Sequence, residues 1–287
     1  MKFRSGEDTL AVLDGFTVQG VFHFNGAISM VNSSGRIRNC RFVGNQNPDP
    51  GYQSSWGAIA FNGGAYLIAE DNYFEGNRSY SSAGIGMWCG TGRIVENTFV
   101  NNEAFGDFGG AIGVGGPCGS AHLIEGNLFV GNTSPVAGAL FISENTGTII
   151  KNNTFISNSS SMNDGGAICI WYYNTGIIIE DNVMVGNSGY GIANIHGSTM
   201  SLDCNDAFNN TPSNYSAGCD AGPHSFSADP LFCSTGMNSY SLEESSPCAP
   251  ANNSCGELIL WAADALVCPV LFPEFIIPPT TDNLYLS

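Results

Sequence analysis

The residues of this 287-residue chain best suited to bind a ligand are three aromatic residues, Trp88, Phe141 and Trp171. Each lies in or directly after a short segment related to Gly-Gly-Ala-Ile, in which small and bulky residues alternate. If such segments are stacked β-strands, the three rings stand on one outward face among small neighbours. A pyranose ring needs rigid aromatic area beside polar groups. The three residues are therefore candidates for glycan contact, the alternative being that they pack against neighbouring loops.

A catalytic centre has weaker support. Asp107 and Asp164 each precede a Gly-Gly segment, two repeats apart, and regular stacking would place them about 10 Å from one another. This exceeds the roughly 6.5–9.5 Å between the carboxyl groups of an inverting glycoside hydrolase, so we interpret both as turn residues and His196 as a surface residue. The chain has no Asp-Asp pair, and the expected ligand face carries no basic residue. We predict no catalytic residues and favour a protein that is not an enzyme.

The composition argues against several kinds of partner. The formal net charge is −17 with only 8 Lys and Arg residues, so the basic clusters that bind nucleic acid or anionic membranes are missing. There is no C-x-x-C motif and the four histidines have no ligand spacing, so we expect no metal and no cofactor. No run of 18 apolar residues predicts a membrane-spanning segment. We expect a monomer that contacts a polysaccharide or a cell-surface glycan.

Ten cysteines indicate an oxidising compartment, so we expect an extracellular or cell-surface protein. No signal peptide is visible in MKFRSGEDTL, and because a degenerate repeat already begins at Thr9, we expect the chain to be truncated at its start. Cys89 and Cys118 follow equivalent segments of consecutive repeats and are expected to form a disulfide. Six further disulfide candidates crowd the end of the chain, for which sequential pairing is the simplest connectivity: Cys204, Cys219, Cys233, Cys248, Cys255 and Cys268.

The elements that position these residues belong to a repeat that ends in asparagine. The closing residues are Asn45, Asn77, Asn102, Asn132, Asn158, Asn187 and Asn210, with gaps of 32, 25, 30, 26, 29 and 23 residues. Each repeat contains three short apolar runs separated by Gly, Asn, Ser and Asp, and none has a sustained helical period. A period of this length indicates a solenoid, here with three strands in each coil.

Two inward columns follow from this alignment. One is a stack of rings, Phe42, Phe74, Phe99, Phe129 and Phe155, continued by Met184. The other is a ladder of asparagines two residues earlier, in which amides pair between coils; it starts at Cys40 and continues with Asn72, Asn97, Asn127, Asn153, Asn182 and Asn205. On the outside, the alignment places Arg38 over Glu70, and Lys151 between Glu125 and Glu180, where opposite charges relieve a column of acids.

The paired Gly-Gly-Ala-Ile and Phe-x-x-Asn signatures resemble the repeats of the chlamydial polymorphic outer membrane proteins, and more generally the right-handed β-helix, pectin-lyase-like repeat proteins of bacterial surfaces. The resemblance implies an all-β fold, a right-handed parallel β-helix, as a single-stranded solenoid of about seven to eight coils with a disulfide-rich C-terminal cap. We expect coils over residues 1–210, a capping segment over 211–257, and an apolar, Pro-rich tail over 258–287.

The fold and the candidate residues lead to two functional hypotheses. The favoured one is a non-catalytic, secreted or cell-surface β-helix for adhesion, glycan contact or service as a structural stalk. The alternative is a polysaccharide lyase or glycoside hydrolase of the pectin-lyase-like fold. The absence of clustered carboxylates and of a basic residue on the ligand face favours the first hypothesis.

Overall fold

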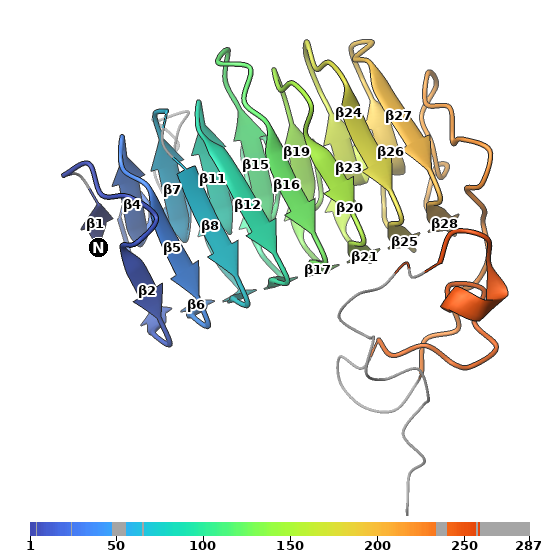
Figure 1. The fold of residues 1–287 in the computed structure, drawn as a ribbon, viewed down its shortest axis with the longest axis horizontal. Coiled ribbons are helices and arrows are strands. Elements are labelled where there is room, and N and C mark those ends of the chain that lie inside the picture. Colours follow the sequence, from blue (N-terminus) through green and yellow to red (C-terminus); the bar gives the residue numbers. More distant parts are fainter. Residues whose placement is uncertain are drawn as a thin grey trace, which may run out of the picture.

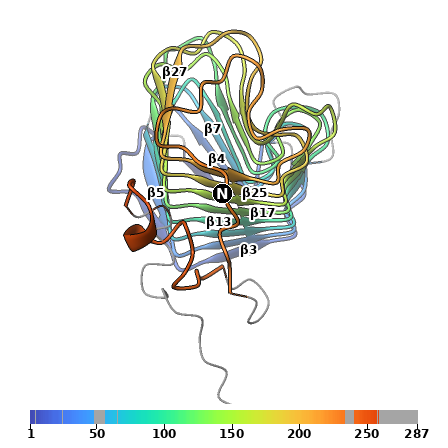
Figure 2. The ribbon, with the colours of Figure 1, turned by 90° about the vertical axis from the view of Figure 1, so that its right-hand side faces the viewer.

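The computed structural model describes residues 1–3, 5–23, 25–47, 56–64, 66–233, 240–256 and 258, and they form a parallel β-solenoid of eight coils (Figure 1). Seen along the axis, the coils superpose on one another from the first to the last (Figure 2). The only helix in this part of the chain is a single 3-10 turn, η1 (Pro250–Asn252). No helix of the described residues has the length and apolar character needed to cross a membrane. The predicted all-β solenoid of about seven to eight coils is confirmed.

Each coil contributes one strand to each of three parallel sheets. Sheet A contains β1 (Lys2–Phe3), β4 (Ile28–Val31), β7 (Ile59–Asn62), β11 (Ile85–Trp88), β15 (Ile112–Gly115), β19 (Leu140–Ile142), β23 (Gly165–Ile170) and β26 (Tyr190–Asn194). Sheet B contains β2 (Val12–Asp14), β5 (Gly35–Arg38), β8 (Tyr66–Glu70), β12 (Thr91–Val95), β16 (His122–Glu125), β20 (Ile149–Lys151), β24 (Ile177–Glu180) and β27 (Met200–Asp203). Sheet C contains β3 (Thr17–Gln19), β6 (Arg41–Val43), β9 (Tyr73–Glu75), β13 (Thr98–Val100), β17 (Leu128–Val130), β21 (Thr154–Ile156), β25 (Val183–Val185) and β28 (Asp206–Phe208).

A fourth, shorter sheet follows the closing asparagines of the central coils and was not predicted. It contains β10 (Arg78–Ser79), β14 (Glu103–Ala104), β18 (Thr133–Ser134) and β22 (Ser159–Ser160). Strands of two residues carry no recognisable alternation of polar and apolar side chains. Their Ser and Thr residues therefore resemble an ordinary turn in the sequence.

Every regular coil turns at two corners, and at each corner one residue adopts the left-handed conformation. At the corner between sheets B and C it is Asn39, Asp71, Glu96, Gly126, Asn152, Asp181 or Cys204, with φ between 51° and 64°. At the corner after sheet C it is Gly44, Gly76, Asn101, Gly131, Ser157, Gly186 or Asn209, with φ between 52° and 63°. Gly and Asn adopt this conformation at the least cost. In nearly every case the next residue is a buried asparagine.

The buried asparagines form two ladders, one at each of these corners. The predicted ladder runs from Asn72 to Asn205; in each step, a side-chain N–H donates to the Oδ1 of the asparagine one coil further on, over 2.9–3.0 Å. The closing asparagines, Asn45 to Asn210, form a second ladder with distances of 2.8–3.0 Å. The same Oδ1 atoms accept the backbone N–H of the preceding coil. These bonds satisfy backbone groups that the bends leave without a sheet partner.

The predicted ring stack lies in the core. Phe42, Phe74, Phe99, Phe129 and Phe155 are fully buried, and neighbouring rings are stacked with centroids 4.6–5.0 Å apart. Met184 continues the column beside Phe155. Each buried ring contributes roughly 1.5–3 kcal/mol of transfer free energy, so the stack holds the coils in one register.

The outward charge column confirms that register. Lys151 pairs with Glu125 on one side and Glu180 on the other, and its Nζ lies 3.0 Å from a Glu125 oxygen. Arg38 lies beside Glu70 as predicted. Its guanidinium nevertheless forms its ion pair with Asp14 at 2.9 Å.

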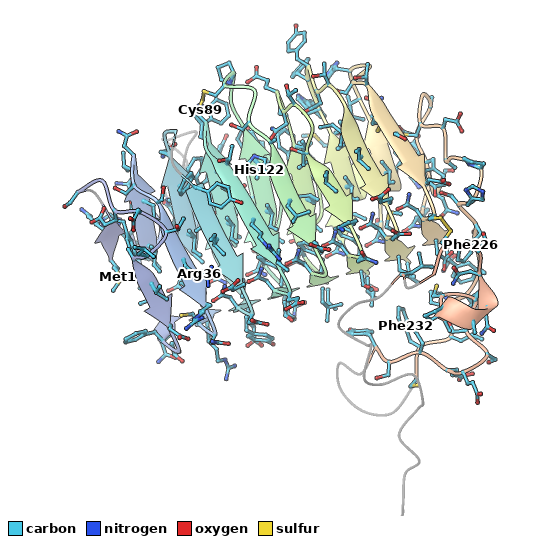
Figure 3. All side chains as sticks on the ribbon, viewed as in Figure 1. Met1, Arg36, Cys89, His122, Phe226 and Phe232 are labelled. Atoms are coloured by element: carbon cyan, nitrogen blue, oxygen red, sulfur yellow. A yellow bond between two sulfur atoms is a disulfide. The ribbon has the colours of Figure 1, made fainter. Side chains whose placement is uncertain are left out.

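The chain beyond the last regular strand closes the end of the solenoid. Tyr215 and Phe226 extend sheets A and C by isolated bridges to Ile192 and Asp206. The segment then turns back onto the outer side of sheet C, where a second apolar cluster covers Val183 of β25; Figure 3 marks Phe226 and Phe232 there. The predicted tail over 258–287 lies outside the described residues, apart from Leu258, which is buried in this cluster.

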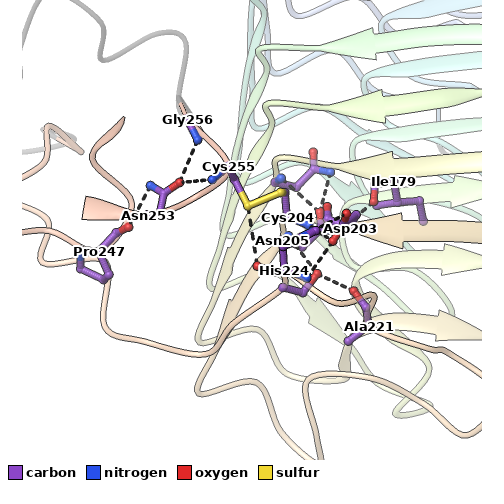
Figure 4. The surroundings of a disulfide bond; sticks show 12 residues. Ile179, Asp203, Cys204, Asn205, Ala221, His224, Pro247, Asn253, Cys255 and Gly256 are labelled. Carbon is purple, nitrogen blue, oxygen red and sulfur yellow. Dashed lines mark hydrogen bonds and ion pairs between the residues drawn. A yellow bond between two sulfur atoms is a disulfide. The ribbon is translucent and has the colours of Figure 1, made fainter. Parts of the chain in front are cut away.

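The cysteines agree with only part of the predicted pairing. Cys89 and Cys118 form the expected disulfide, with Cα atoms 5.2 Å apart. In the cap, sequential pairing is wrong, because Cys204 is bonded to Cys255 (Figure 4). Cys233 is also disulfide-bonded, and Cys268 lies outside the described residues. Cys40, Cys169, Cys219 and Cys248 are free thiols, so Cys219 and Cys248 are not the disulfide partners we predicted.

Candidate functional site

A pocket of about 290 Å³ opens on the outward side of sheet A, where strands β11, β19 and β23 end. We call it the aromatic pocket; its lining residues are Trp88, Asp107, Phe108, Val136, Phe141, Ser143, Glu144, Trp171 and Tyr172. It contains all three predicted glycan-contact residues, Trp88, Phe141 and Trp171. Its volume is close to the lower limit for small-ligand sites, which leaves room for about one sugar ring.

The register of sheet A brings these rings together. Trp88 ends β11 beside Gly115, and Phe141 of β19 lies beside Gly113. A side chain at Gly113 would collide with Ser82 and press on Phe108. Glycine at this position therefore allows the loop that carries Asp107 and Phe108 to lie against the sheet.

The rings pack against one another along the solenoid axis. Phe108 makes edge-to-face contacts with Trp88 and Phe141, at centroid distances of 6.5 and 4.8 Å. Phe141 lies 6.1 Å from Trp171, whose ring is perpendicular to that of Tyr172. Contacts of this kind fix ring orientation, so the pocket is largely formed before any ligand enters.

The prediction that all three rings stand exposed on an outward face is wrong for Phe141. Phe141 is only 4% exposed and forms the floor of the pocket, whereas Trp88 is 39% and Tyr172 41% exposed. The positions that align with Phe141 in the other coils of the sheet are also buried: Ser29, Ala60, Gly86, Gly113, Cys169 and Ala193. The loops cover them because small side chains leave room, so Phe141 packs against Phe108 as the alternative interpretation required.

Two carboxyl groups line the pocket among these rings. Burial raises the pKa of Asp107 to about 6, and its Oδ1 is inaccessible and has no hydrogen-bond partner among the described residues. Glu144 occupies a left-handed corner position, φ 58°, and its backbone N–H donates to the carbonyl of Tyr172 over 2.8 Å. None of the described residues that line the pocket carries a positive charge.

The sequence pointed to some of these residues and missed others. Asp107 was interpreted as a turn residue, and Phe108, Glu144 and Tyr172 were not identified. Asp164 does not line the pocket; burial raises its pKa, and nearby His196 opposes the shift. His196 is exposed, as predicted, and stacks on Tyr172 with ring centroids 3.8 Å apart. The Trp-Tyr-Tyr sequence at 171–173 was the one available signal, an unusual concentration of rings directly after a strand.

Among the described residues, three neighbouring side chains carry atoms that could bind a metal ion, but one of these atoms is already part of a disulfide. They are Asp203, Cys204 and His224, and the Cys204 sulfur is bonded to Cys255 (Figure 4). His224 Nδ1 lies 2.9 Å from Asp203 Oδ2. This hydrogen bond, with the His224 backbone N–H, lowers the pKa of Asp203. The pair ties the cap to the last strand of sheet B.

The comparisons with known proteins agree with the fold. Residues 17–155 match the family model described as "Right handed beta helix region". No curated protein and no solved structure matches the chain. The matched segment begins in β3 and ends in β21, and the later coils continue the same pairing in sheets B and C. The chain therefore has the fold of a right-handed parallel β-helix built from repeats.

Proposed function

We propose that this β-helix is a non-catalytic glycan-binding domain that works outside the cell or on a cell surface, with the aromatic pocket as its binding site. The observation that carries the proposal is the convergence of Trp88, Phe141 and Trp171 on one pocket with polar neighbours. Trp88 and Tyr172 are partly exposed and offer apolar area to a sugar ring, and Ser143 and Glu144 offer hydrogen-bonding groups. The disulfides support an oxidising location.

The test is a glycan array followed by titration calorimetry with the best ligand. Trp88→Ala and Trp171→Ala should each weaken binding about tenfold or more, because each removes the aromatic side chain from one end of the pocket. Tyr66→Ala is the matched control: Tyr66 is 40% exposed, like Trp88, but lies on sheet B. Binding that survives both tryptophan substitutions would move the site elsewhere, and binding to no glycan would favour a structural stalk.

A glycoside hydrolase is the second candidate, and the raised pKa of Asp107 is the observation in its favour. A carboxylic acid that stays protonated near pH 6 can act as a general acid, and Glu144 supplies a second carboxyl group in the same pocket. The glycan panel should therefore also be assayed for new reducing ends. We expect none; release that Asp107→Asn abolishes would contradict the non-catalytic proposal.

A further inference from the structure

We propose that the aromatic pocket selects sugars that carry a free, protonated amino group, such as the glucosamine units of a deacetylated hexosamine polymer. The inference rests on the proposed function, because it names the class of sugar that the same pocket takes. It follows from three features of the lining: its charge, its rings and the half-buried carboxyl group of Asp107.

The charge of the pocket favours a cation. Asp107 and Glu144 are the ionisable acids of its lining, and none of the described lining residues is Lys, Arg or His. The nearest imidazole, His196, lies against the ring of Tyr172 and is not part of the lining. The whole chain carries a net charge of −17. A uronic or sialic acid would bring a third carboxylate into this site, whereas an ammonium group would neutralise one.

The rings favour the same ligand. Five aromatic residues line the pocket: Trp88, Phe108, Phe141, Trp171 and Tyr172. The face of an aromatic ring attracts a cation, and cages of several rings with acidic neighbours are a general solution for binding ammonium groups. A neutral sugar would gain stacking alone from these rings. An amino sugar gains stacking and the attraction of its charge.

The third feature is the carboxyl group of Asp107, which lines the pocket. Its Oδ1 is shielded from solvent and accepts no hydrogen bond from the described residues, which is costly for a carboxylate. An ammonium group has three N–H donors and no acceptor, and in the pocket it brings the opposite charge close to this carboxylate and offsets that cost. N-acetylation removes the charge and two of these donors. The pocket should therefore distinguish an amine from its acetamide.

The experiment compares three oligosaccharides of equal length by calorimetry: a glucosamine oligomer, its fully N-acetylated form and a galacturonate oligomer. We expect the glucosamine oligomer to bind about tenfold or more tightly than the N-acetylated one, and the galacturonate oligomer to bind most weakly. The double variant Asp107→Asn, Glu144→Gln should lose this preference and still bind the N-acetylated oligomer. Glu180→Gln controls for attraction to the acidic surface, because it removes a carboxylate of sheet B and should keep the preference.

Each remaining outcome decides the question. Equal or tighter binding of the N-acetylated oligomer would overturn the amino-sugar inference and leave the glycan-binding proposal intact. If Glu180→Gln abolished the preference as fully as the double variant, the selectivity would come from the overall charge, and the inference would be wrong. If none of the three oligomers bound, nor any neutral glycan of the array, the proposed function itself would fail.

Discussion

His122 is a titratable residue that faces the interior of the solenoid. It lies one coil from Gly92 and two from Leu67 in the same inward column, and only 4% of its surface is exposed. Burial lowers its pKa to about 4, although the Asn145 side chain beside it favours the charged form. A histidine in the unfolded chain has a pKa near 6.5. Its stabilising contribution is therefore complete above about pH 6.5 and is lost as the pH falls toward 4.

The acids with raised pKa act in the opposite direction. Burial raises the pKa of Asp181 and of Asp206 to about 6, above the value near 3.9 of an unfolded Asp. Their contribution to stability is present at low pH and is lost as the pH rises through about 6. The opposite effects of the histidine and of these acids on stability fall in the same range, between about pH 4 and 6.5. The pH profile of the whole protein would therefore not reveal the contribution of His122.

A single substitution separates them. His122→Leu places in this column the residue that the chain itself uses at Leu67, and it removes the titrating group. We expect the fall in unfolding free energy between pH 7 and pH 4 to be smaller in the variant than in the natural chain by about 2–3 kcal/mol. Urea unfolding at the two pH values measures it. An identical fall in both proteins would mean that His122 is not buried in its neutral form.

The corner is the structural element that repeats most strictly, and its two adjacent residues have different tasks. Asn101 adopts the left-handed conformation, φ 52°, with an exposed side chain, and the same position in the coils before and after it is Gly76 or Gly131. Asn102 is fully buried; its side chain donates to the Phe74 carbonyl and to Asn132 Oδ1, and its Oδ1 accepts the N–H of Asn77. The first residue turns the chain, and the second pairs the groups that the turn exposes.

Substitutions of Asn101 and Asn102 should therefore have very different effects on the unfolding free energy. Asn101→Gly keeps the left-handed conformation and should change the unfolding free energy by less than about 1 kcal/mol. Asn102→Ala leaves several buried partners unpaired and should cost about 3 kcal/mol or more. Chemical denaturation of both variants is the measurement. Equal effects of the two substitutions would contradict the separate roles that we assign to the two asparagines.

At the scale of the whole molecule, the sequence predicted the features that recur in every coil. These features are the Phe stack, the asparagine ladder from Asn72 and the outward column that contains Lys151. They could be predicted because the corresponding position recurs in six or seven coils at a constant offset from the closing asparagine. The pocket could not be predicted, because Phe108, Glu144 and Tyr172 have no equivalents in the other coils. They belong to loops whose path depends on small residues in a neighbouring coil, such as Gly113. The cap pairing was missed for the same reason, since the cap has no repeat to align.

The cap is attached to the solenoid at a few identifiable points. Cys255 is bonded to Cys204, at the last left-handed corner between sheets B and C, and His224 binds Asp203 next to it (Figure 4). Between Cys204 and Cys255 the chain extends sheets A and C by one bridge each, at Tyr215 and Phe226, and covers Val183. The coils, in contrast, are joined by continuous sheets and by both asparagine ladders. In a solenoid each unit is stabilised mainly by its neighbours, so the cap can open while the central coils remain folded.

Cys255→Ser tests this view of the whole molecule. A disulfide that closes a loop of this length contributes about 4 kcal/mol by restricting the unfolded chain, and here that contribution should fall mainly on the cap. We expect faster hydrogen exchange over residues 219–256 and unchanged exchange in β13 and β17. Cys219→Ser, which replaces a free thiol of the cap, should leave both regions near the natural rates. If Cys255→Ser accelerated exchange equally in the cap and in the central coils, the cap and the solenoid would unfold as one cooperative unit, and the cap would not open on its own.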